Sequence, residues 1–91
     1  MQVRWSPEAV GDLEYIGRRI ERDKPNAARE VTLRIYRGVT DLSAFPERGR
    51  TGRIDGTREL VFSGLPYIVV YRIAAGHLEI LRIYHAAQDW P

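Results

Sequence analysis

The sequence predicts one α+β domain in which a helical hairpin packs on one face of a sheet. Three observations support this. The chain has 91 residues, which is room for a single domain spanning 1–91. Its first half carries two apolar stripes of helical period. Its second half carries three β-type runs separated by short turns. The predicted order is strand, helix, helix, strand, strand, strand.

The first strand and the first helix follow from local signals. Val3 and Trp5 alternate with polar neighbours, as in a short strand. Ser6 is typical of a helix N-cap and Pro7 of the first helical position. Apolar residues then recur every three or four positions to about residue 22, at Ala9, Leu13, Ile16 and Ile20. Gly17 costs a helix about 1 kcal/mol relative to alanine, so it predicts a close approach to the second helix.

The second helix is expected to begin at Pro25, after a break of about four residues, and to lie antiparallel to the first. Its apolar stripe comprises Ala28, Val31, Ile35, Val39 and Leu42. Residues 46–57 hold three glycines and one proline, and they are predicted to be irregular throughout.

A three-stranded antiparallel meander is predicted for the rest of the chain. Its strands are Arg58–Phe62, Tyr67–Ile73 and His77–His85, joined by turns at 63–66 and 74–76. The tail ends in Trp90, whose burial is worth roughly 2–3 kcal/mol. We therefore expect Trp90 to pack on the domain and hold His85 in place. The alternative is that Trp90 is exposed to solvent and binds a partner protein.

Composition excludes several classes of protein. The chain has no cysteine, which rules out disulfides, thiolate zinc sites and iron–sulfur clusters and favours a reducing compartment, the cytoplasm. The longest uncharged run, Leu60–Tyr71, is too short to span a bilayer, so no membrane partner is expected. No apolar segment typical of a signal peptide follows Met1.

Arginine supplies thirteen of the fourteen basic residues. This bias has two interpretations, a GC-rich genome or recognition of carboxylates and phosphates by guanidinium groups. The net charge of +2 comes from residues 48–91. Arg48, Arg50 and Arg53 lie among glycines in one loop, which is either a phosphate-gripping or a solvated segment. Arg58, Arg72 and Arg82 fall one per strand and could be neighbours, with Glu59 and Glu79 available to pair with them.

No strong enzyme motif is present, and no metal site or cofactor is predicted. The two histidines lie at opposite ends of one strand, about 25 Å apart, too far to share a metal. His77 is expected to be an exposed turn residue. His85 follows Arg82 and Tyr84 and could act as a general acid or base, or be a structural histidine that hydrogen-bonds to backbone.

The order of short motifs along the chain resembles the RelE/ParE superfamily. The motifs are Arg4–Ala9 followed by Asp12, Leu13 and Ile16; Pro25 with Ala27 and Ala28; Leu42, Pro46 and Gly49–Arg50; Gly56–Leu60; Tyr67–Arg72; and Ile80–His85. The resemblance covers nearly the entire chain. It implies the toxin of a type II toxin–antitoxin module that stabilises a plasmid or chromosome. Such a toxin is a small cytoplasmic growth inhibitor that is neutralised by its antitoxin. The toxin would form a homodimer or a hetero-oligomer with the antitoxin.

Two activities occur in this superfamily, and the resemblance implies one or the other; the third alternative is a protein-interaction domain that has lost its toxicity. In a RelE-like endoribonuclease that cleaves mRNA on the ribosome, the catalytic residues would be His85, Arg82 and Glu47. However, Ile68 or Val69 stands where many of these nucleases have an arginine, and Lys24 is the only lysine. These departures favour a ParE-like toxin that poisons DNA gyrase. The residues that bind the target or the antitoxin would then be Arg48, Arg50, Arg53, Arg58, Arg72 and Trp90.

Overall fold

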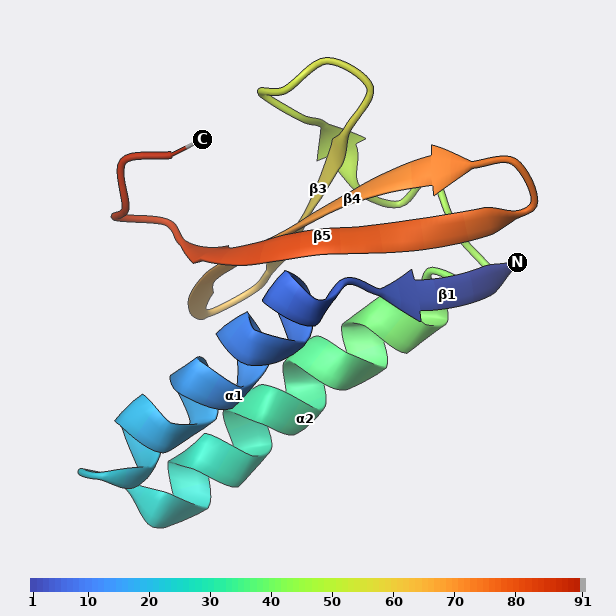
Figure 1. Ribbon diagram of the computed structural model, residues 1–91. Helices are drawn as coiled ribbons and strands as arrows, with labels where there is room; N and C mark the ends of the chain where they lie inside the picture. The colour runs from blue at the N-terminus through green and yellow to red at the C-terminus, as the bar shows by residue number, and fades with distance from the viewer. Residues whose placement is uncertain (91) are drawn as a thin grey trace.

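The computed structural model describes residues 1–90 and has the predicted order of elements plus one short strand. The elements are β1 (Gln2–Trp5), α1 (Pro7–Glu21), α2 (Pro25–Asp41), β2 (Arg50–Thr51), β3 (Arg58–Phe62), β4 (Leu65–Ala74) and β5 (His77–His85). The two helices lie on one side of the sheet and the C-terminal tail on the other (Figure 1). The predicted α+β architecture is confirmed.

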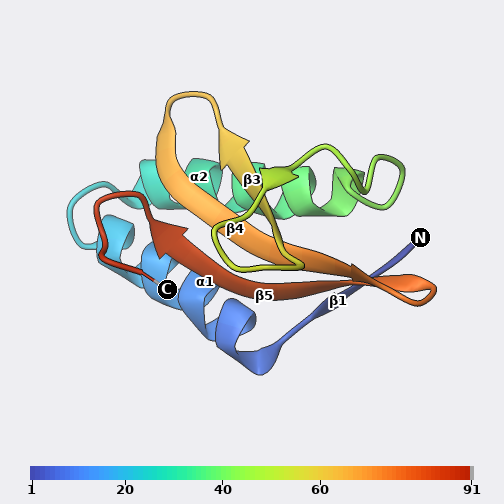
Figure 2. The same ribbon diagram turned by 90° about the horizontal axis from the view of Figure 1, so that it is seen from above.

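The sheet has five strands in the order β1-β5-β4-β3-β2. Strands β3, β4 and β5 form the predicted antiparallel meander. Strand β1 pairs in parallel with β5, from Gln2 opposite His77 to Trp5 opposite Ile80. Strand β4 pairs with one edge of β5, and β1 pairs with the other edge (Figure 2). The N-terminal strand therefore borders the strand that carries His85.

Two details of the predicted elements were wrong. Residues 46–57 are not wholly irregular, because Arg50 and Thr51 pair with Glu59 and Arg58 as the edge strand β2. Strand β3 would otherwise be an unpaired edge, and two residues of the loop cover part of it. The turn expected at 63–66 is tighter, because Gly64 has a φ of 77° and lets Ser63–Gly64 reverse the chain.

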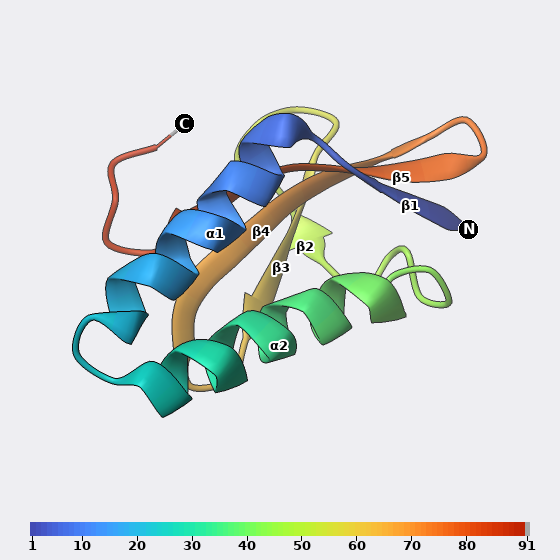
Figure 3. The same ribbon diagram turned by 60° about the horizontal axis from the view of Figure 1, so that its bottom comes forward.

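The helical hairpin is bound to the sheet at Ser6, and its two helices approach each other closely at Gly17. Ser6 caps α1, since its hydroxyl accepts a hydrogen bond from the Ala9 N–H (3.0 Å) and donates one to the Leu81 carbonyl on β5 (2.9 Å). The two helices lie against the same face of the sheet and diverge from their connecting turn (Figure 3). A Cβ on Gly17 would lie 3.2 Å from the Thr32 methyl of α2. The predicted close approach at Gly17 is therefore confirmed.

Apolar side chains gather on both faces of the sheet. The helix-facing core is the larger, and its buried members are Ala9, Ile16, Ile35, Val39, Leu42, Leu60, Val69, Tyr71, Leu78, Ile80 and Ile83. On the outer face a smaller cluster holds Ile68, Val70 and Trp90. Neither α1 nor α2, the helices within residues 1–90, is long and apolar enough to cross a membrane.

Candidate functional site

The C-terminal tail is docked on the outer face of the sheet by Trp90. This side chain is 5% exposed and packs against Ile68 and Val70. Its ring stacks on Tyr84, with centroids 4.6 Å apart and planes 5° apart. The four residues before it, 86–89, are exposed. The expectation that Trp90 packs on the domain is confirmed.

His85 is fixed by the turn of the tail rather than by Trp90 itself. The Ala87 N–H donates to His85 Nδ1 (3.0 Å), and the His85 N–H donates to Gln88 Oε1 (2.6 Å). Tyr67 meets the imidazole edge-on, with centroids 5.5 Å apart. Because Nδ1 is an acceptor, the neutral ring carries its proton on Nε2. Within residues 1–90 no carboxylate hydrogen-bonds to this ring, so the contacts that orient it come from backbone and aromatic groups.

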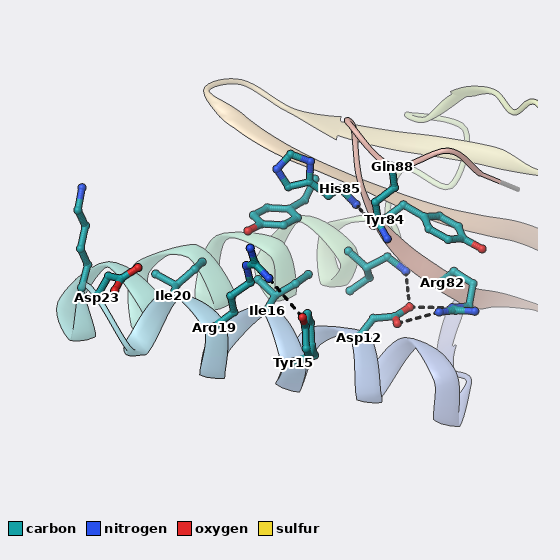
Figure 4. Close-up of a pocket in the computed structure, with 13 residues that line it drawn as sticks. Asp12, Tyr15, Ile16, Arg19, Ile20, Asp23, Arg82, Tyr84, His85 and Gln88 are labelled. Atoms are coloured by element: carbon teal, nitrogen blue, oxygen red, sulfur yellow. Dashed lines mark hydrogen bonds and ion pairs between the residues drawn. The ribbon is translucent and has the colours of Figure 1, made fainter.

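Arg82 is bound to Asp12 of α1. Its Nε and Nη2 donate to the two Asp12 carboxylate oxygens at 2.8 and 3.0 Å (Figure 4). The Ile83 N–H donates to the same carboxylate (2.9 Å). The hydrogen bonds to Asp12 raise the pKa of Arg82 above its usual range. This bidentate pair ties α1 to β5, and it occupies the guanidinium edge that would otherwise grip a phosphate.

Removing either side of the Asp12–Arg82 pair is expected to destabilise the fold. The Asp12 side chain is 18% exposed and that of Arg82 is 44% exposed, so solvent screens the pair in part. In a double-mutant cycle of Asp12→Asn and Arg82→Gln, urea unfolding should give a coupling energy of about 1 kcal/mol. The same cycle on the more exposed pair Arg48 and Asp41, whose charged atoms are 4.0 Å apart, should give almost none. Equal coupling in both cycles would contradict the structural role given to Arg82.

A groove of about 590 Å³ lies between α1 and the end of β5 (Figure 4). Apolar side chains form its floor, and both acidic and basic side chains lie along its rim. It is lined by Asp12, Tyr15, Ile16, Arg19, Ile20, Asp23, Lys24, Tyr67, Arg82, Ile83, Tyr84, His85 and Gln88. The structure therefore brings two of the three predicted catalytic residues, His85 and Arg82, to one groove.

Glu47, the third predicted catalytic residue, lines a different and shallower hollow beside Phe45 and Arg48. Its neighbour Pro46 accepts a hydrogen bond from Tyr71, whereas His85 lies opposite Tyr67 in the sheet. Four residues along β4 separate these two tyrosines, a distance of about 13 Å. Glu47 is thus placed apart from His85. Across the described part of the chain, no group of three or more His, Asp and Glu side chains could hold a metal ion.

The segment 46–57, which carries Arg48, Arg50 and Arg53 and is called the arginine loop below, is held in place by Glu59. Arg50 donates through Nε (3.1 Å) and Nη2 (2.9 Å) to one Glu59 oxygen, and the Arg53 N–H donates to the other (2.8 Å). Arg53 then places its guanidinium 4.6 Å from the centre of the Trp90 ring. Arg48 lies over the Phe45 ring, 4.8 Å from its centre. The loop packs against the sheet and touches the tail.

Arg58, Arg72 and Arg82 do not form a shared cluster. Arg58 donates to the carbonyl of Gly49 (2.7 Å). Arg72 pairs with Glu79, and this contact, followed by that of His77, lowers the pKa of the Glu79 carboxyl. The His77 side chain is only 16% exposed, so its expected place in an exposed turn was wrong. Each arginine has its own partner, which removes the repulsion that shared placement would create.

Residues 3–90 match the model of the ParE toxin family, described as the ParE toxin of the type II toxin–antitoxin system parDE. The chain belongs to this family. Two relatives are similar over nearly their whole length. Y4kP of Sinorhizobium fredii (strain NBRC 101917 / NGR234) is 47% identical over 99% of this chain and 93% of its own. Toxin RelE2 of Caulobacter vibrioides (strain ATCC 19089 / CIP 103742 / CB 15) is 39% identical over 96% of this chain and 97% of its own.

Solved structures place the fold of this ParE-family chain among toxin–antitoxin complexes. A chain from the chromosomal ParDE system of P. aeruginosa aligns with a TM-score of 0.85 and 26% identity, over 93% of this chain and 95% of that one. A chain of the RelBE2 complex from Mycobacterium tuberculosis aligns with a TM-score of 0.68 and 26% identity, over 92% and 95%. The predicted membership of the RelE/ParE superfamily is confirmed.

Sequence reasoning did not find the residues that organise this ParE-family site. Asp12 was named as part of the family resemblance, and nothing in its own segment indicates its partner 70 residues away. Glu59 was available as a partner for a strand arginine but binds Arg50 and Arg53 of the loop instead. Tyr71 stood in a β-type run, and its buried hydroxyl was not singled out. The one usable signal was an acid at 59 directly before the apolar residues 60–62 of the strand.

Proposed function

We propose that this chain is the toxin of a type II toxin–antitoxin pair and acts in the cytoplasm by poisoning DNA gyrase. The observation that carries the proposal is the separation of the candidate catalytic groups. Arg82 is bound to Asp12, and Glu47 lies in another hollow from His85. A nuclease needs a base, an acid and cations around one phosphate. A toxin that acts by binding another protein needs no such assembly.

A cognate antitoxin is the second part of the proposal. Membership of the ParE family supports it, as does the likeness to chains from ParDE and RelBE2 systems. The surface offered to gyrase or antitoxin comprises Arg48, Arg50, Arg53, Arg58, Arg72 and the exposed residues 86–89 of the tail. Trp90, which is buried, would support this surface by holding the tail in place. The toxin would form a hetero-oligomer with the antitoxin and thereby stabilise the replicon that encodes the pair.

Ribosome-dependent cleavage of mRNA is the second candidate function. Two features favour it. His85 is exposed, and its Nδ1 already accepts a hydrogen bond from the Ala87 N–H. Nε2 is therefore the ring nitrogen that could exchange a proton with a substrate. Arg82 lines the same groove, and its side chain is 44% exposed. These two residues could serve one phosphate if the Asp12 pair opened.

A His85→Ala variant separates the two functions. For the gyrase function we expect growth inhibition on induced expression, and inhibition of supercoiling by the purified protein, to stay close to those of the parent. For the nuclease function both toxicity and mRNA cleavage would fall by about 10²–10⁴-fold, because proton transfer is lost. His77→Ala, at the other end of β5, is the matched control. Loss of toxicity in folded His85→Ala, with cleavage by the parent, would refute gyrase poisoning.

A further inference from the structure

The Glu59 carboxylate is buried on the outer face of the sheet, with only 2% of the residue exposed. Both of its oxygens are used, Oε1 by Arg50 and Oε2 by the Arg53 N–H. A buried charge is costly unless it is paired and hydrogen-bonded, and here every partner comes from the arginine loop. The ion pair is therefore formed only when the loop lies in this one conformation.

Net stability is a poor explanation for such a pair. A buried ion pair gains little over apolar side chains of the same size, because desolvation offsets the attraction. The Arg50 side chain is still 55% exposed, so the pair is open to screening on one side. What the contact does achieve is geometry, since three hydrogen bonds fix one arginine side chain and one backbone N–H relative to β3.

Arg53 connects the loop that Glu59 holds to the C-terminal tail. Its backbone is held by Glu59, and its guanidinium lies 4.6 Å from the centre of the Trp90 ring. The same guanidinium donates to the Trp90 carbonyl (3.4 Å). Trp90 in turn stacks on Tyr84. The side chains of residues 86–89 are exposed, so besides the backbone hydrogen bond from Ala86 to Pro66 (2.7 Å) the tail depends on this ring and on the turn at His85 for its position.

We propose that Glu59 is a positioning residue, which fixes the arginine loop from beneath and, through Arg53, holds Trp90 and the C-terminal tail against the sheet. The loop and the tail then form one unit. The proposed function is needed only for the consequence in cells, namely that loosening the loop weakens toxicity through the tail. The geometric claim is independent of the target.

The test measures the exposure of Trp90 in a Trp5→Phe background, where Trp90 is the only tryptophan. Glu59→Gln keeps the size of the side chain but replaces one of its two acceptor oxygens with an N–H₂ donor, so that either the Arg50 guanidinium or the Arg53 N–H loses its acceptor. We expect acrylamide quenching of Trp90 to rise several-fold and its emission to shift to the red, with the far-ultraviolet circular dichroism unchanged. Glu79→Gln is the matched control, a sheet glutamate paired with Arg72 outside the loop and the tail, and should leave Trp90 shielded.

A second variant keeps the test decisive if Glu59→Gln does not fold. Arg53→Met removes the guanidinium from the Trp90 ring and preserves the backbone N–H that Glu59 binds. Because Arg53 is exposed, the fold should survive, and Trp90 should again become accessible to quencher. Trp90 as shielded as in the parent, in either folded variant, overturns the proposal.

Growth assays of Glu59→Gln, made with Trp5 intact, separate this inference from the proposed function, because the buried Glu59 is not among the residues proposed to contact the target. Release of Trp90 together with reduced growth inhibition supports both. Release of Trp90 with full growth inhibition still supports the positioning role of Glu59, and it shows that the tail does not contact the target. A shielded Trp90 contradicts the positioning role, whatever happens to growth.

Discussion

Replacing Trp90 with alanine is expected to lower the free energy of unfolding by about 2–3 kcal/mol, because the ring is the main apolar group that holds the tail. The ring covers Ile68 and Val70, which would return to solvent. The released tail regains chain entropy, so the loss should stay below that of a tryptophan in the main core. For a domain of this size the melting temperature should fall by roughly 10–20 °C.

Two further variants define what the Trp90 ring contributes. Trp90→Phe keeps a ring to stack on Tyr84 and should recover part of the lost melting temperature. Asp89→Ala changes the neighbouring exposed residue and should have almost no effect. An unchanged melting temperature in Trp90→Ala, together with loss of growth inhibition, would instead show that the ring serves a partner rather than the fold.

Local signals were sufficient for most of the fold. The pair Ser6 and Pro7 fixed the start of α1, and Gly17 marked the helix crossing, because caps and close approaches have residue-type requirements that are visible in sequence. Short glycine turns likewise defined the meander. Trp90 was correctly expected to dock because exposure of a large aromatic ring is costly.

What could not be predicted are contacts between distant parts of the chain. The parallel pairing of β1 with β5 depends on which sheet edge remains free after the meander forms. Asp12 and Arg82 are separated by 70 residues, and each looks like an ordinary surface charge in its own segment. Glu59 has several arginines within reach in sequence, and only the fold of the loop selects Arg50. The sequence therefore predicted the arginines and His85 as candidate site residues, but not the groups that bind and orient them.

Tyr71→Phe is expected to be the second most damaging of the predicted substitutions, although it removes a single oxygen. Tyr71 is fully buried, and its hydroxyl donates to the Pro46 carbonyl (2.7 Å) and accepts from the Gly49 N–H (2.9 Å). Phenylalanine would leave both backbone groups without this partner, at a cost of about 1–3 kcal/mol. The melting temperature should fall by roughly 5–20 °C.

Alkaline pH offers a second measurement on Tyr71. Burial raises the pKa of its phenol above 10.0, against the opposing effects of the Gly49 hydrogen bond and the Arg58 charge. A raised pKa in the folded state stabilises the protein below pH 10 and loses that contribution as the pH rises through the folded value. Stability should therefore fall less steeply above pH 10 in Tyr71→Phe than in the parent.

The control for Tyr71 is Tyr67→Phe, four residues away on β4 and only partly buried, which should change the melting temperature little. Gly49→Ala disturbs the same contact from the loop side, since a Cβ there would lie 2.6 Å from the Tyr71 hydroxyl oxygen. If the hydroxyl joins the arginine loop to the sheet, the two substitutions together should cost less than the sum of their separate effects. Full additivity, or a Tyr71→Phe variant as stable as Tyr67→Phe, would show that the Tyr71 hydroxyl does not hold the loop.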